Sequence, residues 1–194
     1  MVGDRYQFIK DPGCYPGSDV LINLADLRDQ NALDSFEIEQ VGRRSLQPPP
    51  DGNFDTAHYR ALHWHLFQDV YVWAGDYRTV LTWKGESRFA QPDFIPHQMD
   101  VAFARLQKHS FFPGGDEEEF IVQAAEFLGD VNHIHPFREG NGRTQLTFLR
   151  LIGQRAGHPF RSENVEPEEF LNAMIQSYHG RMEALIDELE RMLA

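Results

Sequence analysis

Residues 132–146 read NHIHPFREGNGRTQL. They join two segments, 117–133 and 143–156, in which apolar residues recur every three or four positions. This spacing predicts an amphipathic helix on either side of the quoted segment. Acidic residues at the start of the first helix suit the positive end of its dipole, and Gly157 suits a stop after the second. The sequence therefore predicts a helix–loop–helix unit centred on residues 135–142.

The second half of this loop has the residues of an anion-binding site. Gly140, Asn141 and Gly142 tolerate backbone conformations that other residues resist. They immediately precede a predicted helix, and the free N–H groups and dipole at a helix N-terminus favour an anion such as phosphate. Arg143 adds a cation with several hydrogen-bond donors in the first turn. This part of the loop is therefore a predicted phosphate-binding site.

Two further residues add chemistry to that site. Glu139 lies beside the glycines, where a carboxylate repels phosphate unless a divalent cation bridges the two, so Mg²⁺ is expected. His135 is a titratable base whose unperturbed pKa is about 6.5. Each residue alone is also compatible with a plain turn, but a turn has no use for the complete set. Together they predict a phosphoryl-group transfer site.

The segment from His135 to Arg143 resembles the motif of the Fic family, His-x-Phe-x-(Asp/Glu)-Gly-Asn-Gly-Arg, at every defined position. Residues 67–78 and 84–89 resemble the helix, turn and β-hairpin flap that precede the motif in this family. Residues 15–21 are similar to the N-termini of Fic toxins from bacterial toxin–antitoxin pairs. The resemblance covers nearly the whole chain. It implies an all-α fold, a Fic-fold helical domain with a small β-hairpin flap.

The resemblance also implies a role for each motif residue. His135 would deprotonate a Tyr, Thr or Ser hydroxyl of a target protein, and that oxygen would attack the α-phosphate of ATP, so that AMP joins the target and pyrophosphate leaves. Glu139 would hold Mg²⁺ between the phosphates. The N–H groups of Gly140–Gly142, with the Asn141 side chain, would hold phosphate oxygens. Arg143 would bind the departing phosphates.

Two other regions gain a role from the resemblance. The flap would clamp an extended segment of the target by strand addition, and a hairpin that only closes the fold is the alternative. The flap residues assigned to target positioning are Thr79, Val80, Leu81, Lys84 and Phe89. Tyr178 falls where family members contact adenine, and a core position is the alternative interpretation of this tyrosine. Phe137 is expected in the core, where its ring would fix the loop.

Two positions distinguish this chain within the family. The branch that phosphorylates its targets carries lysine at the position of Gly142, so Gly142 favours AMP transfer, while branches that transfer other nucleotide-borne groups stay open. A second arginine often follows three positions after Arg143, where this chain has Leu146. In the family, that arginine engages the γ-phosphate and an inhibitory glutamate. The resemblance therefore does not extend to these two functions at Leu146.

Self-inhibition in many family members comes from a helix with the pattern Ser/Thr-x-x-x-Glu-Gly/Asn. Residues 35–40, SFEIEQ, match its first five positions and end in Gln40. Two fixed residues are a weak match, so a capping or surface role is the favoured interpretation. The last predicted helix, 182–193, has no such pattern. Inhibition is therefore expected from a separate small antitoxin chain that carries an inhibitory helix.

The whole chain, 1–194, is predicted to be a single domain, with lead-in helices in 1–50 and the Fic core in 51–194. A small hairpin is predicted from the β-prone run 78–83 and its return at 88–90. Helical spacing predicts further helices at 20–27, 31–44, 55–70, 96–109, 167–179 and 182–193. The residues interpreted as structural or inert are His63, His65, His133 and Cys14.

Composition excludes several other classes of protein. The formal net charge of −12 argues against broad binding to DNA or to acidic membrane surfaces. No apolar run approaches the roughly 20 residues that span a bilayer, and no signal peptide is evident. The chain has one cysteine and neither a His-Glu-x-x-His nor a Cys-x-x-Cys pattern, so disulfides and structural zinc are not expected. A cytoplasmic protein without direct nucleic-acid or membrane partners is predicted.

The predicted function is that of a Mg²⁺-dependent protein adenylyltransferase, which transfers AMP from ATP to a hydroxyl side chain of a target protein. By analogy with the toxins, the targets would be type II topoisomerase subunits, those of DNA gyrase or topoisomerase IV. The first alternative is a non-catalytic Fic module that binds a nucleotide or a protein. The presence of His135 argues against this module, and Leu146 argues for it. A weaker alternative is an enzyme of the same fold that uses another nucleotide or transfers a phosphate or phosphocholine.

Overall fold

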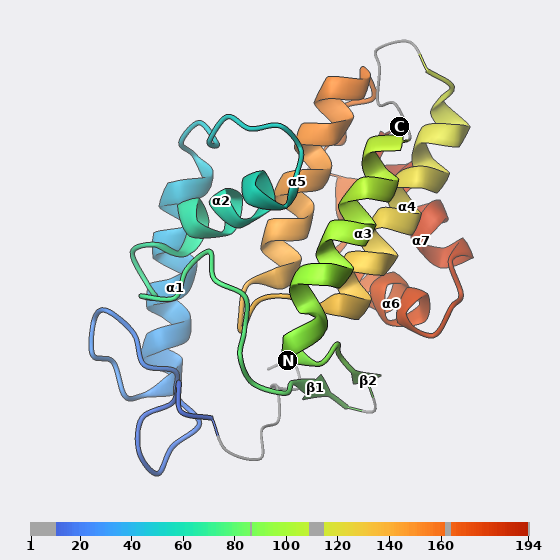
Figure 1. Cartoon of the computed structure of the whole chain (residues 1–194). Coiled ribbons are helices and arrows are strands. Elements are labelled where there is room, and N and C mark those ends of the chain that lie inside the picture. The colour runs from blue at the N-terminus through green and yellow to red at the C-terminus, as the bar shows by residue number, and fades with distance from the viewer. Residues whose placement is uncertain (1–10, 86, 109–114, 162–163, 194) are drawn as a thin grey trace.

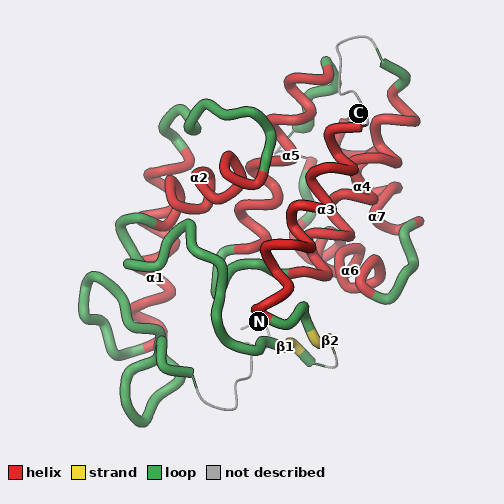
Figure 2. The backbone as a smooth tube through the Cα atoms, viewed as in Figure 1, coloured by secondary structure: helices red, strands yellow, loops and turns green. Residues whose placement is uncertain are grey.

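The computed structural model describes residues 11–85, 87–108, 115–161 and 164–193. Within these ranges the chain forms helices joined by loops, with one two-stranded antiparallel sheet (Figures 1 and 2). The helices are α1 (Gln30–Ser45), α2 (Thr56–Phe67), α3 (Ile95–Lys108), α4 (Glu117–Ile134), α5 (Asn141–Ala156), α6 (Pro167–Tyr178) and α7 (Glu183–Leu193). The remaining elements are the strands β1 (Trp83–Lys84) and β2 (Ser87–Arg88) and the 3-10 helix η1 (Pro92–Phe94). The predicted all-α class with a small hairpin is confirmed.

Helix α4 is the central helix, because α3, α5, α6 and α7 all pack against it (Figure 1). The Asp116 side chain caps its first turn by accepting a hydrogen bond from the Glu119 N–H. Its apolar positions repeat at helical spacing and are buried in the main core: Phe120, Ala124, Phe127, Leu128 and Val131. Helix α5 buries Phe148, Leu149 and Ile152 in the same core. The two helices that flank the motif loop are therefore firmly held.

Helices α1 and α2 enclose a second hydrophobic cluster beside the main core. Helix α2 contacts α1 on one side and α5 on the other. Asp29 and Asp55 begin the two helices, since each side chain accepts a hydrogen bond from an N–H in the first turn. The buried members of the cluster are Val20, Leu21, Leu33, Val41, Leu66, Phe67, Val70, Tyr71 and Ala74. The cluster therefore also fixes the segment that leads from α2 toward the flap.

Most predicted helix bounds agree closely with the structure. The helices predicted at 31–44, 117–133, 167–179 and 182–193 are confirmed to within one residue at each end. The helix predicted at 96–109 begins one residue earlier, at Ile95, and its predicted last residue, 109, lies outside the described residues. The helix predicted over 55–70 is too long, because α2 ends at Phe67 and turns follow it. Helix α5 begins at Asn141, two residues earlier than predicted.

The predicted helix at 20–27 is wrong, because an asparagine side chain organises this segment into turns. Asn23 donates to the carbonyl oxygens of Leu21 and Leu27 and accepts from the Leu27 N–H. Leu21 also pairs with Cys14 in an isolated antiparallel bridge. Side-chain bonds of this kind compete with the backbone bonds of a helix. Val20 and Leu21 are nevertheless buried, so the lead-in packs on the second cluster as a loop.

The hairpin is shorter than predicted. Each strand contributes two residues, with Trp83 opposite Arg88 and Lys84 opposite Ser87. The run 78–82 is loop, and its first residue, Arg78, is buried. The β-branched residues of this run therefore lead into the flap as loop, with one backbone bond to its return, from the Phe89 N–H to the Thr82 carbonyl oxygen.

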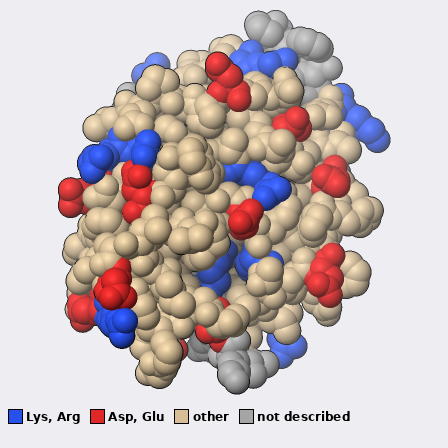
Figure 3. All heavy atoms as spheres, turned by 60° about the vertical axis from the view of Figure 1, so that its left-hand side comes forward, with Lys and Arg blue, Asp and Glu red and all other residues tan. Residues whose placement is uncertain are grey.

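The face of the molecule in Figure 3 carries charged side chains of both signs. Lys and Arg atoms lie there in small groups beside Asp and Glu, without one broad basic area. This distribution agrees with the net charge of −12, and it offers no extended electrostatic footprint for nucleic acid on that face. None of the helices in the described ranges is long and apolar enough to cross a bilayer.

Candidate active site

The loop between α4 and α5 begins with a left-handed backbone conformation at His135. This residue ends α4 with a φ of 52°, and its N–H donates to the carbonyl oxygen of Val131. Left-handed conformations are uncommon for residues other than glycine. The turn carries the chain sharply away from the helix axis, and the histidine side chain is buried. The predicted base therefore lies inside the fold.

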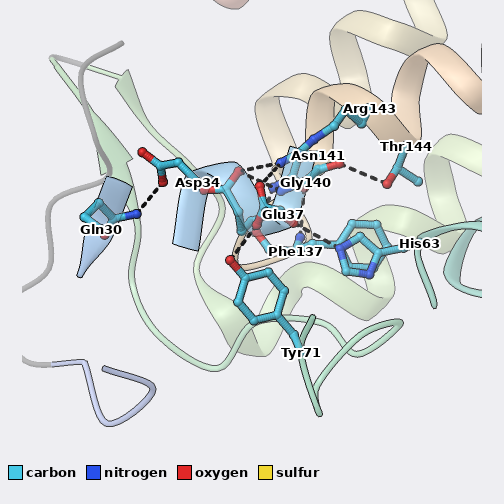
Figure 4. A network of polar contacts seen from close by, with 11 residues as sticks. Gln30, Asp34, Glu37, His63, Tyr71, Phe137, Gly140, Asn141, Arg143 and Thr144 are labelled. Atoms are coloured by element: carbon cyan, nitrogen blue, oxygen red, sulfur yellow. Dashed lines mark hydrogen bonds and ion pairs between the residues drawn. The ribbon is translucent and has the colours of Figure 1, made fainter. Parts of the chain in front are cut away.

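The Asn141 side chain closes the loop on itself (Figure 4). Its Oδ1 accepts from the Phe137 N–H at 2.9 Å, and its Nδ2 donates to the Phe137 carbonyl oxygen at 2.8 Å. Asn141 is 1% exposed and Phe137 is fully buried, so the predicted core position of Phe137 is confirmed. Both polar ends of the Asn141 amide are used inside the loop. The structure therefore gives this side chain a role in loop shape.

Gly140 has two separate reasons to be glycine. Its φ is 79°, in the left-handed region, and a Cβ atom here would lie 2.2 Å from Cζ of Phe67. Its carbonyl oxygen accepts from the N–H and from Oγ1 of Thr144, at 3.1 and 3.0 Å. These bonds begin α5. The N–H groups of its first residues, Asn141 and Gly142, have no acceptor within the helix.

Three charged residues meet at the start of α5, and Figure 4 labels two of them, Glu37 and Arg143. Nη2 of Arg143 lies 2.6 Å from Oε1 of Glu37, on α1, and 3.5 Å from Oε1 of Glu139. The other oxygen of Glu37 accepts from the Tyr71 hydroxyl at 2.5 Å. Burial and the nearby Glu37 carboxylate raise the pKa of Glu139. The cluster holds two carboxylates and one guanidinium, so a cation beside Glu139 would offset excess negative charge.

His63 supports the loop from α2. Its Nδ1 accepts from the Gly75 N–H at 2.8 Å, so Nε2 carries the proton and donates to the Glu139 carbonyl oxygen at 3.0 Å. The ring is fully buried and stacks on Phe137 with centroids 3.8 Å apart. Burial lowers the pKa of His63 to about 3, so the ring is neutral near pH 7. One tautomer of this histidine therefore fixes the backbone of Glu139.

Two arginines support the first half of the loop. Nε of Arg78 donates to the His135 carbonyl oxygen at 2.8 Å, and the Arg78 N–H donates to that of Pro136 at 2.9 Å. Arg138 pairs with Asp11 at 2.6 Å, and both side chains are nearly buried. Buried charges need partners of this kind. The lead-in and the segment before the flap are therefore part of the loop's support.

The His135 imidazole lies beneath a flap residue. Phe89 stacks on it with ring centroids 3.9 Å apart and an angle of 13° between the planes. Burial, followed by the positive charges of Arg78 and Lys84, lowers the pKa of His135 to about 3. The ring is therefore neutral near pH 7, and a neutral imidazole has a lone pair that accepts a proton.

Tyr178 connects α6 to the flap. Its hydroxyl donates to the Arg88 carbonyl oxygen at 2.5 Å. Its ring stacks on His133 with centroids 5.0 Å apart and meets Phe89 edge-on at 5.9 Å. Tyr178 is half-buried, so it is not a core residue of the bundle. It lies against the aromatic ring that covers His135, and its predicted contact with adenine stays a prediction.

The model of the Fic/DOC family matches residues 53–153, which is more than half of the chain. The chain belongs to this family. A protein of Sinorhizobium fredii named "Probable protein adenylyltransferase y4lH" is 45% identical over 190 residues, which cover 97% of this chain and 99% of that protein. The family predicted from the loop is therefore confirmed.

Solved Fic structures share the fold. The BepC protein of Bartonella tribocorum, a VirB-translocated effector with bound AMPPNP, matches with a TM-score of 0.82 and 27% identity, over 93% of this chain and 95% of that chain. The N-terminal Fic domain of a VirB-translocated Bep effector protein from Bartonella quintana, with bound ADP, matches with a TM-score of 0.83 and 29% identity, over 93% of each chain. The predicted Fic fold is confirmed.

The predicted Fic site residues fall in the motif loop, in the flap and in the segment before the flap. The loop 135–143 brings the histidine, the glutamate, the glycines and the arginine together, and Lys84 and Phe89 belong to the flap beside it. Thr79, Val80 and Leu81 lie in the loop before β1, outside the paired strands. Three of the five residues predicted to position the target therefore lie outside the two-stranded sheet of the flap.

Gly142 and Leu146, the two positions at which the sequence predicts a difference from other branches of the family, lie in different surroundings. Gly142 is exposed, and a Cβ atom there would meet open space. Leu146 is half-buried and packs against the main core. Arg150, one turn later, is exposed. Leu146 therefore acts as a packing residue, whereas packing places no demand on Gly142.

Sequence reasoning missed three residues that support the Fic loop: Glu37, Tyr71 and Arg138. The sequence gives no signal for Glu37, because its partner lies far away in the chain. His63 was interpreted as structural, and its buried ring agrees with this interpretation. A histidine among the apolar positions of α2 must satisfy both ring nitrogens inside the fold.

Proposed function

We propose that this Fic protein is a protein adenylyltransferase, which transfers AMP from ATP to a hydroxyl side chain of a target protein. The observation that carries the proposal is the loop 135–143, where a neutral buried imidazole, a helix N-terminus, a carboxylate and an arginine lie together. The name of the Sinorhizobium fredii relative supports this activity. The AMPPNP bound to the Bartonella tribocorum structure supports an adenine nucleotide as the substrate.

His135 is the proposed general base. Its neutral ring would accept the proton of the target hydroxyl while that oxygen forms a bond to the α-phosphorus of ATP and the bond to pyrophosphate breaks. An imidazole with a pKa of about 3 is a weak base. We therefore propose that the Phe89 side chain moves away from the His135 imidazole when a target protein binds. The pKa of His135 would then rise toward its ordinary value.

The N-terminus of α5 is the proposed phosphate site. The N–H groups of Asn141 and Gly142 are free of helix bonds, and the space beside Gly142 is open. Arg143 is partly exposed, so its guanidinium is accessible beside them. Because the Asn141 side chain is engaged with Phe137, we assign phosphate binding to the backbone N–H groups and the arginine.

Glu139 is the proposed ligand of Mg²⁺. Burial and Glu37 raise its pKa, so a divalent cation beside it would stabilise the ionised carboxylate. Within the described ranges, no three His, Cys, Asp or Glu side chains form a group that could hold a metal ion. Phosphate oxygens of the nucleotide and water would therefore complete the coordination. Bound there, Mg²⁺ would offset negative charge on the phosphates.

A Fic module that binds a nucleotide without transferring AMP is the second candidate. One observation favours it, since Phe89 covers the His135 ring. The resemblance adds a second argument, because it implies an arginine at the position of Leu146. Both candidates predict nucleotide binding that survives the substitution His135→Ala. Only the enzyme predicts AMP transfer that this substitution abolishes.

The partners are proposed from the resemblance of residues 15–21 to Fic toxins. We propose a cytoplasmic toxin that acts on subunits of DNA gyrase or topoisomerase IV and that is held inactive by a small antitoxin chain. Glu39, the glutamate of the weak inhibitory pattern on α1, is exposed. Its exposure supports an inhibitor that comes from a separate chain.

The position of the transferred label tests the reaction class without knowledge of the target. A bacterial lysate is incubated with the chain, Mg²⁺ and ATP labelled on either the α- or the γ-phosphate. Relative to lysate without the chain, the proposal predicts additional labelled protein bands with the α-label only, and none of these bands with the His135→Ala variant. Additional bands with the γ-label that depend on the wild-type chain would show phosphorylation instead and would contradict the proposal. The exposed His97, on α3, provides a matched control as His97→Ala.

A further inference from the structure

A chain of three side chains leads from the second cluster into the loop (Figure 4). The Tyr71 hydroxyl donates to Oε2 of Glu37, and Oε1 of Glu37 accepts from Nη2 of Arg143. Tyr71 is 2% exposed, and the Glu37 side chain is 12% exposed. Glu37 lies outside residues 53–153, the part of the chain that matches the family model. A residue of the lead-in therefore touches the arginine of the motif.

We propose that Glu37 is a positioning residue, which holds the Arg143 guanidinium in the orientation that binds the nucleotide phosphates. This inference rests on the phosphate-binding role proposed above for Arg143. Glu37 acts only through the arginine. Tyr71 in turn fixes the Glu37 carboxylate.

The geometry of the arginine suits this role. Within the described part of the chain, both carboxylate contacts of the guanidinium run through Nη2, and Nε and Nη1 have no hydrogen-bond partner. The guanidinium also lies over the Phe67 ring, with Cζ 4.7 Å from the centroid. Phe67 thus covers one face of the guanidinium, and the two carboxylates occupy its Nη2 corner. The opposite edge keeps donors for an anion, in the planar arrangement that suits phosphate.

The contact between Glu37 and Arg143 is held in place, because α1 is anchored to the rest of the fold. Leu33 and Val41 of this helix are buried in the second cluster. At its C-terminal end, Arg44 binds both oxygens of Asp69, at 2.6 and 2.8 Å, and the Arg44 carbonyl oxygen is bound by His65. A carboxylate that blocked the phosphate site would have to move away before each reaction, and this anchoring opposes such movement. Positioning therefore fits the structure better than blockage.

Holding the arginine in place has a clear benefit. A free arginine loses side-chain entropy when it binds a phosphate, and an arginine that is already ordered has lost that entropy on folding. Glu37 also has a cost, because its charge raises the pKa of Glu139. The gain has to exceed that cost for the positioning role to hold. Whether removal of the Glu37 charge weakens or strengthens nucleotide binding therefore decides whether Glu37 is a positioning residue.

The test compares Glu37→Gln with Glu39→Gln. Both substitutions remove one negative charge from α1, but Glu39 is exposed. The probe is AMPPNP with Mg²⁺, measured by calorimetry, beside KM and kcat for AMP transfer. For Glu37→Gln we expect AMPPNP affinity to fall about tenfold and KM for ATP to rise by a similar factor, with a smaller change in kcat. Glu39→Gln should match the wild-type chain. Unchanged or tighter binding in Glu37→Gln would overturn the inference.

A double substitution separates positioning from general stability. If Glu37 acts through the arginine, Glu37→Gln has no further effect on AMPPNP affinity in an Arg143→Ala chain. A second loss of similar size there would contradict the inference. Tyr71→Phe keeps the ring and removes the donor to Glu37, so it should weaken binding in the same direction by a smaller factor.

The failure of this inference is distinguishable from that of the proposed transfer reaction. A wild-type chain that binds AMPPNP but transfers no AMP would contradict only the adenylyltransferase. In that case, weaker AMPPNP binding in Glu37→Gln would still support the positioning role. A wild-type chain that does not bind AMPPNP would overturn both.

Discussion

At the scale of single residues, Gly140 and Asn141 determine the shape of the loop. Gly140 combines a left-handed φ with close approach to Phe67, and Asn141 binds both backbone groups of Phe137. The need for glycine was predictable, since conformational freedom is a local property. The use of the Asn141 side chain was not, because it depends on where the loop turns back on itself.

The two glycines of the motif should respond differently to alanine. Gly140→Ala is expected to lower the free energy of unfolding by about 2–4 kcal/mol, because it combines left-handed strain with a steric clash. Gly142→Ala should be neutral or stabilise the chain by up to about 1 kcal/mol, since the site is open and lies in a helix. Urea unfolding of the two variants measures both. Equal effects would contradict the structural account of Gly140.

Two buried histidines predict a loss of stability in acid. Burial lowers the pKa of His63 and of His135 to about 3, whereas both titrate near 6.5 in the unfolded chain. The contribution of the two neutral histidines to the free energy of unfolding is therefore complete above about pH 6.5 and is lost as the pH falls toward 3. Each histidine should add a slope of about 1.4 kcal/mol per pH unit within this window. The same slope in wild type and in His135→Gln, measured by urea unfolding between pH 6 and 4.5, would contradict this assignment.

At the scale of elements, the flap has a sheet of only two short strands, yet one of its residues covers the imidazole of His135. Its strands pair over two residues each, yet Phe89, which directly follows β2, covers His135. Tyr178 holds the same end of the flap from α6. The flap therefore controls the environment of the imidazole by an aromatic contact, in addition to any role in target binding.

Removal of the Phe89 ring should make His135 easier to protonate. In Phe89→Ala, we expect the pKa of His135 to rise from about 3 toward its usual value of about 6.5, because burial is the largest cause of the shift. Arg78 and Lys84 should keep it below that value. Phe94→Ala is the matched control, since that phenylalanine is exposed. The measurement is NMR titration of the His135 ring, and an unchanged pKa in Phe89→Ala would contradict the account.

The elements differ in how far the sequence predicts them. Helices with a clear apolar repeat, such as α4 and α6, were predicted to within a residue, because their burial pattern is periodic. The segment 20–27 has apolar residues at helical spacing but is loop, because Asn23 offers competing hydrogen bonds. The run 78–82 has strand propensity, but the pairs of the described sheet begin only at Trp83, and a single backbone bond joins the Thr82 carbonyl oxygen to the Phe89 N–H. Local propensity fails where a single polar side chain or the extent of strand pairing decides the structure.

At the scale of the whole molecule, the site joins segments that are far apart in the chain. The loop 135–143 is contacted by Asp11 from the lead-in, Glu37 from α1 and His63 from α2. The motif itself was visible in the sequence because its residues are contiguous. The contacts of its supporting residues were not visible, because each contact depends on packing between elements that no local pattern reports.

Because α1 is anchored in the second cluster and carries Glu37, we expect a cavity in this cluster to weaken nucleotide binding at the site. Leu33→Ala should lower the free energy of unfolding by about 2–5 kcal/mol, because Leu33 is 1% exposed. It should also weaken AMPPNP binding in the folded protein, since α1 carries Glu37. Ile38→Ala, on the same helix and 71% exposed, should change neither quantity. Thermal unfolding and calorimetry measure both effects, and normal binding in a destabilised Leu33→Ala would show that α1 and the site are independent.

AMP transfer through His135 is tested most directly by intact-mass analysis of purified gyrase and topoisomerase IV subunits. Each subunit is incubated with ATP, Mg²⁺ and either the wild-type chain or the His135→Ala variant, and AMPPNP binding is measured for both chains. The account predicts a gain of one AMP on a subunit with the wild-type chain, no gain with the variant, and retained AMPPNP binding in the variant. A gain of AMP that persists in His135→Ala, or a gain of one phosphate in place of AMP, would contradict it.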